Sequence, residues 1–279
     1  MRVFLLTAAT MACFAANSLL TRGALGGGRL DWASFMLIRL VTGAVTMTML
    51  VRARGRAPAD RGGWVPALTL AAYAVTFTYA YTRIGAAVGA LLLFGAVQVT
   101  MIGTGLARGE RPARVDWGGV VLAVAGLLAL TLPGATAPDG LGAALMLAAG
   151  VCWGAYSLLG RGSRDPLAVT ADNFVRASAM GLVGVAAFVS RDTFTMSGFW
   201  LAAASGAVAS GIGYTLWYTV LPHLAAWRAA IAQLTVPVLT ALLAAALLAE
   251  AVPTRLVVAT ALVLAGVGLT TIPALHRRA

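Results

Sequence analysis

Long apolar runs alternate with short polar segments along the whole chain of 279 residues. Each run is about 18 residues or longer, the length that an α-helix needs to cross a lipid bilayer. The segments between them are rich in Arg, Gly and Pro, which mark turns and helix ends. The alternating segments of roughly 10 residues that are typical of outer-membrane barrels do not occur. The pattern predicts an all-α integral membrane protein with ten transmembrane helices, at about residues 3–22, 32–51, 64–82, 84–107, 115–132, 140–159, 168–189, 197–219, 224–249 and 254–273.

One stretch of the chain occurs twice. Cys13–Gly23 and Cys152–Gly162, which begins 139 positions later, share seven of eleven residues: Cys, Ala, Ser, Leu, Leu, Arg and Gly. Tyr81 likewise matches Tyr218 at an offset of 137. Similar offsets across five spans indicate a duplication, with a first five-helix repeat at 1–134 and a second at 135–279.

The two predicted repeats must lie in opposite orientations, because each has five spans and an odd number carries the chain across the membrane. Inverted repeats are typical of alternating-access transporters, whose binding site lies near the midplane where the repeats meet. The distribution of Arg predicts the overall orientation, since cytoplasmic loops carry the excess of positive charge. With a cytoplasmic N-terminus the inner segments hold twelve Arg and the outer loops five, so both termini are predicted to be cytoplasmic.

Composition narrows the class of protein further. Hydrophobic residues make up 60% of the chain and charged residues 10%, and a soluble domain of this length cannot hide so much apolar surface from water. All 20 basic residues are Arg, mostly in short loops, so we interpret the net charge of +11 as membrane orientation rather than nucleic-acid binding. Cys13 and Cys152 fall within predicted helices, which favours small buried residues over a disulfide.

No acidic residue or histidine falls in the middle of a predicted span. The nine acids lie in loops or near span ends, and so do His223 and His276. Proton-coupled carriers commonly use a buried carboxylate that titrates, so proton coupling at the midplane has no candidate residue. Metal binding and hydrolytic catalysis need the same kinds of side chain. The sequence therefore predicts no metal, no cofactor and no enzymatic activity.

Two arginines are exceptions to the apolar spans. Arg39 and Arg176 each lie about two turns into a predicted helix, at a rise of about 1.5 Å per residue. A charge at such a position is costly and usually faces the bundle or reaches for the interface. Asp172 precedes Arg176 by four residues on the same helical face and can pair with it. We interpret the three as gating or anchoring charges, with direct contact to a substrate as the alternative.

Aromatic and amide residues within the spans are the better candidates for a binding site. Several recur at i, i+3 or i, i+4 and occupy equivalent positions in the two repeats. Buried amides in lipid need partners, so they should face the bundle or a cavity, or else join helices. A lining of this kind suits a small ligand with an apolar or planar part. The predicted substrate-binding residues are Phe14, Asn17, Phe77, Tyr81, Phe94, Gln98, Trp153, Tyr156, Tyr214, Trp217, Tyr218 and Gln233.

This organisation resembles the drug/metabolite transporter superfamily, EamA type. The resemblance rests on the duplication of five spans, the repeated segment on the first and sixth spans, an Arg in the second and seventh, and Glu110 and Glu250 after the fourth and ninth. The amino-acid exporters typified by the bacterial YddG proteins are the branch that it resembles most. That family usually carries a Pro in the ninth span, which Pro237 matches as a structural or gating residue. The equivalent position of the first repeat is Val97, a departure from the family pattern.

The resemblance implies a multi-pass protein of the bacterial inner membrane that exports small metabolites, with aromatic amino acids as the favoured substrates. Its partners would be the small-molecule substrate and the lipid bilayer. An exporter of drugs or lipophilic cations with an aromatic cage is the alternative, and a structural or lipid-interacting membrane protein is another. Small residues in the fifth and tenth spans permit close helix approach, within the chain or in a homodimer.

Overall fold

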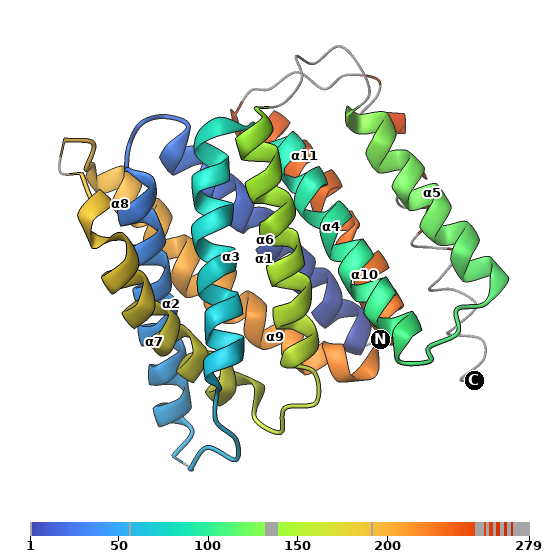
Figure 1. The fold of residues 1–279 in the computed structure, drawn as a ribbon, viewed down its shortest axis with the longest axis horizontal. Helices are drawn as coiled ribbons and strands as arrows, with labels where there is room; N and C mark the ends of the chain where they lie inside the picture. Colours follow the sequence, from blue (N-terminus) through green and yellow to red (C-terminus); the bar gives the residue numbers. More distant parts are fainter. Residues whose placement is uncertain are drawn as a thin grey trace.

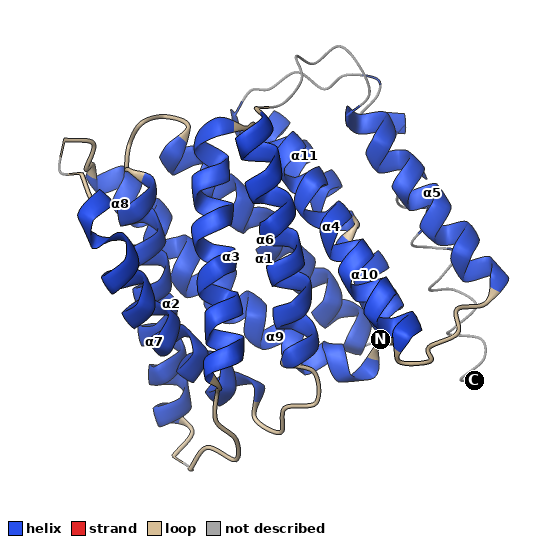
Figure 2. Ribbon diagram, viewed as in Figure 1, coloured by secondary structure: helices blue, strands red, loops and turns tan. Residues whose placement is uncertain are grey.

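The computed structural model describes residues 2–55, 57–131, 139–190 and 192–248, with 254, 257–258, 261–262, 265–266 and 269. Within these residues the regular structure is helical throughout (Figures 1 and 2). Six helical segments are long and apolar enough to cross a membrane: Arg2–Leu25, Trp32–Ala53, Val88–Ala107, Gly140–Leu159, Met196–His223 and Ala226–Leu247. The chain is therefore a multi-pass membrane protein, as the apolar runs predict. The tenth predicted span, 254–273, falls largely outside the described residues.

The first seven predicted spans correspond to seven helices whose ends differ from the prediction by a few residues. The short 3-10 helix η1, Ala186–Phe188, continues the last of them. The helices are α1 (Arg2–Leu25), α2 (Trp32–Ala53), α3 (Trp64–Arg83), α4 (Ala86–Ala107), α5 (Arg114–Thr131), α6 (Gly140–Leu159) and α7 (Pro166–Val185).

Acidic residues at span ends cap these helices. The Asp31 carboxylate accepts the backbone N–H of Ser34 at the start of α2, and Asp139 does the same at the start of α6. Asp165 caps α7, directly before Pro166. An N-cap side chain satisfies one of the backbone donors that a helix start leaves unpaired. These three acids therefore have local structural roles, which agrees with their absence from the middle of the spans.

The eighth predicted span is irregular in its middle. It comprises α8 (Met196–Ala204), the π-helical segment η2 (Ser205–Ile212), α9 (Gly213–Val220) and the 3-10 helix η3 (Leu221–His223). A π-helical turn is wider than an α-helical one, is rare, and frequently occurs at functional sites. Here it packs against α2, where a Cβ on Gly206 would run into the Arg39 carbonyl and the Thr42 hydroxyl. Only glycine lets the two backbones approach this closely.

The ninth predicted span is broken into two helices rather than continuous. α10 covers Ala226–Gln233 and α11 covers Thr235–Leu248, with Leu234 between them. The break lies one turn before Pro237, whose ring has no N–H to give to the carbonyl of Gln233 and crowds that carbonyl. The equivalent helix of the first half, α4, carries Val97 at the matching position and runs unbroken.

Helices of the two halves interleave around one core (Figure 1). α3 packs against α6 and α7, and α6 also packs against α4. Correspondingly, α1 packs against α8, η2 and α9, and against α11, while α2 packs against α7 and η2. These pairings exchange with one another when each helix is replaced by the helix that the predicted duplication makes equivalent to it. In Figure 1, α5 lies at the edge of the bundle, beside α4.

Polar contacts join the two halves at both ends of the bundle. The segments after α2, α4, α6 and α9 lie at the end where α1 begins (Figure 1). At that end Arg54 pairs with Asp165, and Glu110 binds both Arg161, at 3.1 Å, and the backbone N–H of Ala226. At the opposite end the Thr195 hydroxyl donates to the Arg29 carbonyl at 2.8 Å. These contacts hold segments of the two halves together at each end of the bundle.

Candidate functional site

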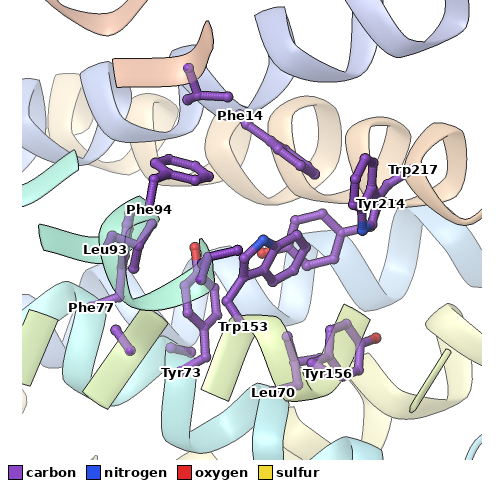
Figure 3. Packing of buried hydrophobic residues seen from close by; sticks show 14 of the residues in the cluster. Phe14, Leu70, Tyr73, Phe77, Leu93, Phe94, Trp153, Tyr156, Tyr214 and Trp217 are labelled. Carbon is purple, nitrogen blue, oxygen red and sulfur yellow. The ribbon is translucent and has the colours of Figure 1, made fainter. Parts of the chain in front are cut away.

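A small cavity lies at the centre of the bundle, where helices of both halves meet. Its walls come from α1, α3 and α4 of the first half and from α6 and α9 of the second (Figure 3). The cavity volume is about 10 Å³, the room that a single water needs. An amino acid therefore fits only if the surrounding side chains move apart. The lining residues are Phe14, Asn17, Ser18, Tyr73, Phe77, Leu93, Phe94, Trp153 and Tyr214.

Trp153 of α6 is the centre of the aromatic cluster around this cavity (Figure 3). Its ring lies 4.6 Å from Tyr214, 5.2 Å from Phe14 and 5.4 Å from Tyr73 between centroids. The indole N–H donates to the side-chain oxygen of Gln233 at 2.7 Å. Rings at these separations and a satisfied indole N–H fix the orientation of Trp153. The Trp153 face presented to the cavity is therefore set by contacts from α1, α3, α9 and α10.

Six of the twelve predicted substrate-binding residues line the cavity: Phe14, Asn17, Phe77, Phe94, Trp153 and Tyr214. The other six are buried one layer further out. Among these, Gln98 donates to the Ala230 carbonyl at 2.6 Å and so joins α4 to α10, the helix-joining role left open for the amides. The Gln233 side chain accepts the hydrogen bond from the Trp153 indole N–H. The outer six are Tyr81, Gln98, Tyr156, Trp217, Tyr218 and Gln233.

Hydrogen bonds and ring contacts hold the outer aromatic residues in place. The Trp217 indole donates to the Ser157 hydroxyl at 3.1 Å, and the Tyr218 hydroxyl donates to the Tyr156 carbonyl at 3.0 Å. Tyr81 packs edge-on against Phe77 at 4.8 Å between ring centroids. A buried aromatic side chain with its polar group bonded is a rigid support. These residues back the cavity walls rather than form them.

The lining residue of most consequence that sequence reasoning missed is Tyr73. It lies four residues before Phe77 and therefore on the same face of α3, a spacing that could have identified it. Its repeat-equivalent, 137 positions later, is Ser210, so the comparison of the two halves drew no attention to it. Ser18 and Leu93 were missed as well.

Arg39 lies directly behind the cavity wall and is 1% exposed. Its guanidinium donates to the Ser210 hydroxyl at 3.0 Å, to the Tyr214 hydroxyl at 2.9 Å and to the Tyr73 hydroxyl at 3.4 Å. Tyr73 and Tyr214 line the cavity, and Tyr73 also accepts a hydrogen bond from the Asn17 amide at 3.4 Å. The positive charge is thus one side chain away from the cavity.

Arg176, which lies 137 positions after Arg39 at the matching place in the predicted duplication, has a different environment. It pairs with Asp172 at 3.1 Å across one helical turn, which confirms the predicted pairing. Its guanidinium lies 4.8 Å from the ring centroid of Trp64, near the end of the bundle where α3 begins. Arg176 is partly exposed, whereas Arg39 is fully buried.

Comparisons with known proteins also indicate a membrane transporter. Residues 140–272 match the EamA-like transporter family, a family of transporters rather than of enzymes. A protein of Pseudomonas aeruginosa described as uncharacterized is 49% identical over 279 residues, which is 100% of this chain and 97% of the relative. A solved crystal structure superposes with a TM-score of 0.78 at 20% identity, over 95% of this chain and 98% of the other, so the two share a fold. The chain belongs to the EamA-like transporter family.

Proposed function

We propose that this transporter exports small metabolites, with aromatic amino acids as its substrates, from a bacterium across its inner membrane. The observation that carries the proposal is the cluster of aromatic rings around a cavity built by both halves of the chain. Aromatic faces bind planar apolar groups, and the hydroxyls and amide among them bind polar ones. Phe14 and Asn17 occupy the same repeat positions as Trp153 and Tyr156, so the two sides of the site differ and suit a solute with two distinct ends.

An alternating-access mechanism with inverted repeats at 1–134 and 135–279 is the movement we propose. It is supported by helix pairings that exchange when the halves are exchanged. The excess of Arg in the segments after α2, α4 and α6 supports cytoplasmic termini. Rocking of the halves would break the contacts at one end, such as those of Glu110, and keep those at the other. The cavity would widen as its walls, which belong to different halves, move apart.

We expect efflux to follow the substrate gradient without a proton gradient. The sequence places the nine acids in loops or near the ends of predicted spans, so proton coupling in the middle of a span has no candidate carboxylate. Liposomes containing the protein would be loaded with labelled L-phenylalanine, and efflux measured at equal pH and with an imposed pH gradient. Equal initial rates are expected. Efflux that stops when the pH gradient is removed would show that the proposed energy coupling is wrong.

The same vesicles separate the proposal from its rivals. Unlabelled tryptophan should slow the efflux of labelled phenylalanine, whereas tetraphenylphosphonium should not. The opposite order would favour an exporter of lipophilic cations. Efflux no faster than from protein-free liposomes, for either class of solute, would favour a structural membrane protein.

A further inference from the structure

Arg39 brings a positive charge into the interior of the bundle, where it has no acidic partner among the described residues. An arginine side chain stays protonated at any physiological pH. Four ion pairs occur among the described residues and Arg39 belongs to none of them. Its described partners are the neutral hydroxyls of Tyr73, Ser210 and Tyr214. A buried charge inside a membrane protein is normally paired with an opposite charge. The described residues supply no such anion for Arg39.

Hydrogen-bond donors, and not acceptors, are left over around this charge. The NH1 group of Arg39 is buried and has no partner among the described residues. The Tyr73 hydroxyl accepts hydrogen bonds from Arg39 and Asn17, and the Tyr214 hydroxyl accepts one from Arg39. The two hydroxyls also hydrogen-bond to each other, so one of their two protons remains available to a ligand. Both tyrosines line the cavity.

The aromatic faces of the site already hold a cation. The guanidinium carbon of Arg39 lies 5.3 Å from the ring centroid of Tyr73 and 5.2 Å from that of Phe77. These distances are within the range of cation–π attraction. A lipophilic cation in the cavity would therefore compete with Arg39 for the same rings and be repelled by its charge.

We propose that Arg39 recognises an anionic group of the transported solute, a carboxylate, together with the hydroxyls of Tyr73 and Tyr214. The proposal rests on the proposed function for the identity of the site and adds the chemical class of its ligand. A carboxylate accepts hydrogen bonds through both oxygens and would neutralise the charge. Tyrosine hydroxyls that accept from a guanidinium become stronger donors, which favours an anion on their far side.

Arg176 provides a matched control within the same chain. It occupies the equivalent place in the second repeat, 137 positions later. Asp172 neutralises it, whereas the residue equivalent to Asp172 in the first repeat is Phe35. Of these two arginines, Arg39 is the one without an acidic partner among the described residues.

The first test compares two probes that differ in charge and share a phenyl ring. Thermal stabilisation of the purified wild-type protein in detergent would be titrated with 3-phenylpropionate, which has the carboxylate alone, and with 2-phenylethylamine, which has the amine alone. The carboxylate should bind roughly tenfold or more tightly than the amine, since charge-assisted hydrogen bonds are strong and the amine meets a like charge. Equal binding of the two, or tighter binding of the amine, would overturn the proposal.

The second test uses variants with the same probes. Arg39→Gln should lose the preference for 3-phenylpropionate, whereas Arg176→Gln should keep it. Arg39→Lys keeps the positive charge but loses the planar set of guanidinium N–H donors. It should keep the preference for 3-phenylpropionate and bind it several-fold more weakly. A full preference in Arg39→Gln would overturn the proposal. If Arg39→Gln does not fold, Arg39→Lys decides, because unchanged affinity there would contradict recognition by the guanidinium.

The two proposals fail in different ways. Arg39-dependent binding of 3-phenylpropionate without any amino-acid efflux would leave the anion site standing and refute amino-acid export. Phenylalanine efflux that 2-phenylethylamine inhibits as well as 3-phenylpropionate does, in wild type and Arg39→Gln alike, would leave export standing and refute the role of Arg39.

Discussion

Trp153→Ala is expected to reduce L-phenylalanine efflux to roughly a tenth or less of the wild-type rate, because Trp153 forms one wall of the cavity and orients the rings beside it. The substitution also removes ring contacts to Phe14, Tyr73 and Tyr214 and leaves Gln233 without its indole partner. Truncation of a buried aromatic residue costs about 3 kcal/mol or more of folding free energy. Efflux from liposomes and the melting temperature in detergent measure the two effects.

Trp200→Ala is the matched control, because that indole is 65% exposed on the surface of α8. It should leave both measurements close to the wild type. Trp153→Phe keeps a ring in the site but loses the hydrogen bond to Gln233, so an intermediate rate is expected. A folded Trp153→Ala protein that transports phenylalanine at the wild-type rate would show that the central cavity is not the transport site.

Gly206→Ala is expected to destabilise the packing of η2 against α2. The new Cβ would collide with the Arg39 carbonyl and the Thr42 hydroxyl, so α2 and η2 would have to separate. Overpacking of this kind costs about 1–3 kcal/mol, and here it falls on backbone atoms that cannot rotate away. The separation would also stretch the hydrogen bonds from Arg39 to Ser210 and Tyr214. Both the melting temperature and phenylalanine efflux should fall.

Gly103→Ala tests whether the loss comes from the close approach itself. Gly103 lies within α4 and a Cβ there meets nothing within 4 Å. Alanine stabilises an exposed helix position by about 0.8–1 kcal/mol relative to glycine. Gly103→Ala should therefore match or exceed the wild type in melting temperature. Equal stability of Gly206→Ala and the wild type would mean that α2 and η2 tolerate a wider spacing.

Hydropathy was sufficient to locate nine of the helical regions but not their internal irregularities. Apolar length predicts a membrane span whatever the backbone does inside it. The break at Leu234 could have been inferred from Pro237, since proline removes the hydrogen bond to the residue four positions earlier. Hydropathy did not predict the π-helical segment Ser205–Ile212, in which Gly206 packs closely against α2.

For the candidate site, the type of residue predicted which side chains gather around the cavity better than its position on the helix predicted which of them line it. Aromatic residues at equivalent places in the repeats were brought to one cluster, although half of the predicted residues support the wall rather than line it. Which layer a ring occupies depends on helix rotation, which the pattern does not specify. Asp172, four residues before Arg176, predicted the pairing of that arginine. By contrast, the burial of Arg39 against the hydroxyls of Ser210 and Tyr214 comes from tertiary contacts that the sequence pattern does not specify.

Equilibrium binding of labelled L-phenylalanine to the purified protein in detergent tests most directly whether the two halves build a single substrate site. We expect saturable binding at one molecule per chain, because α1, α3 and α4 share one cavity with α6 and α9. Displacement by 3-phenylpropionate should accompany it. Two equal sites per chain, one for each repeat, or no saturable binding by the folded protein, would contradict a shared site for aromatic amino acids.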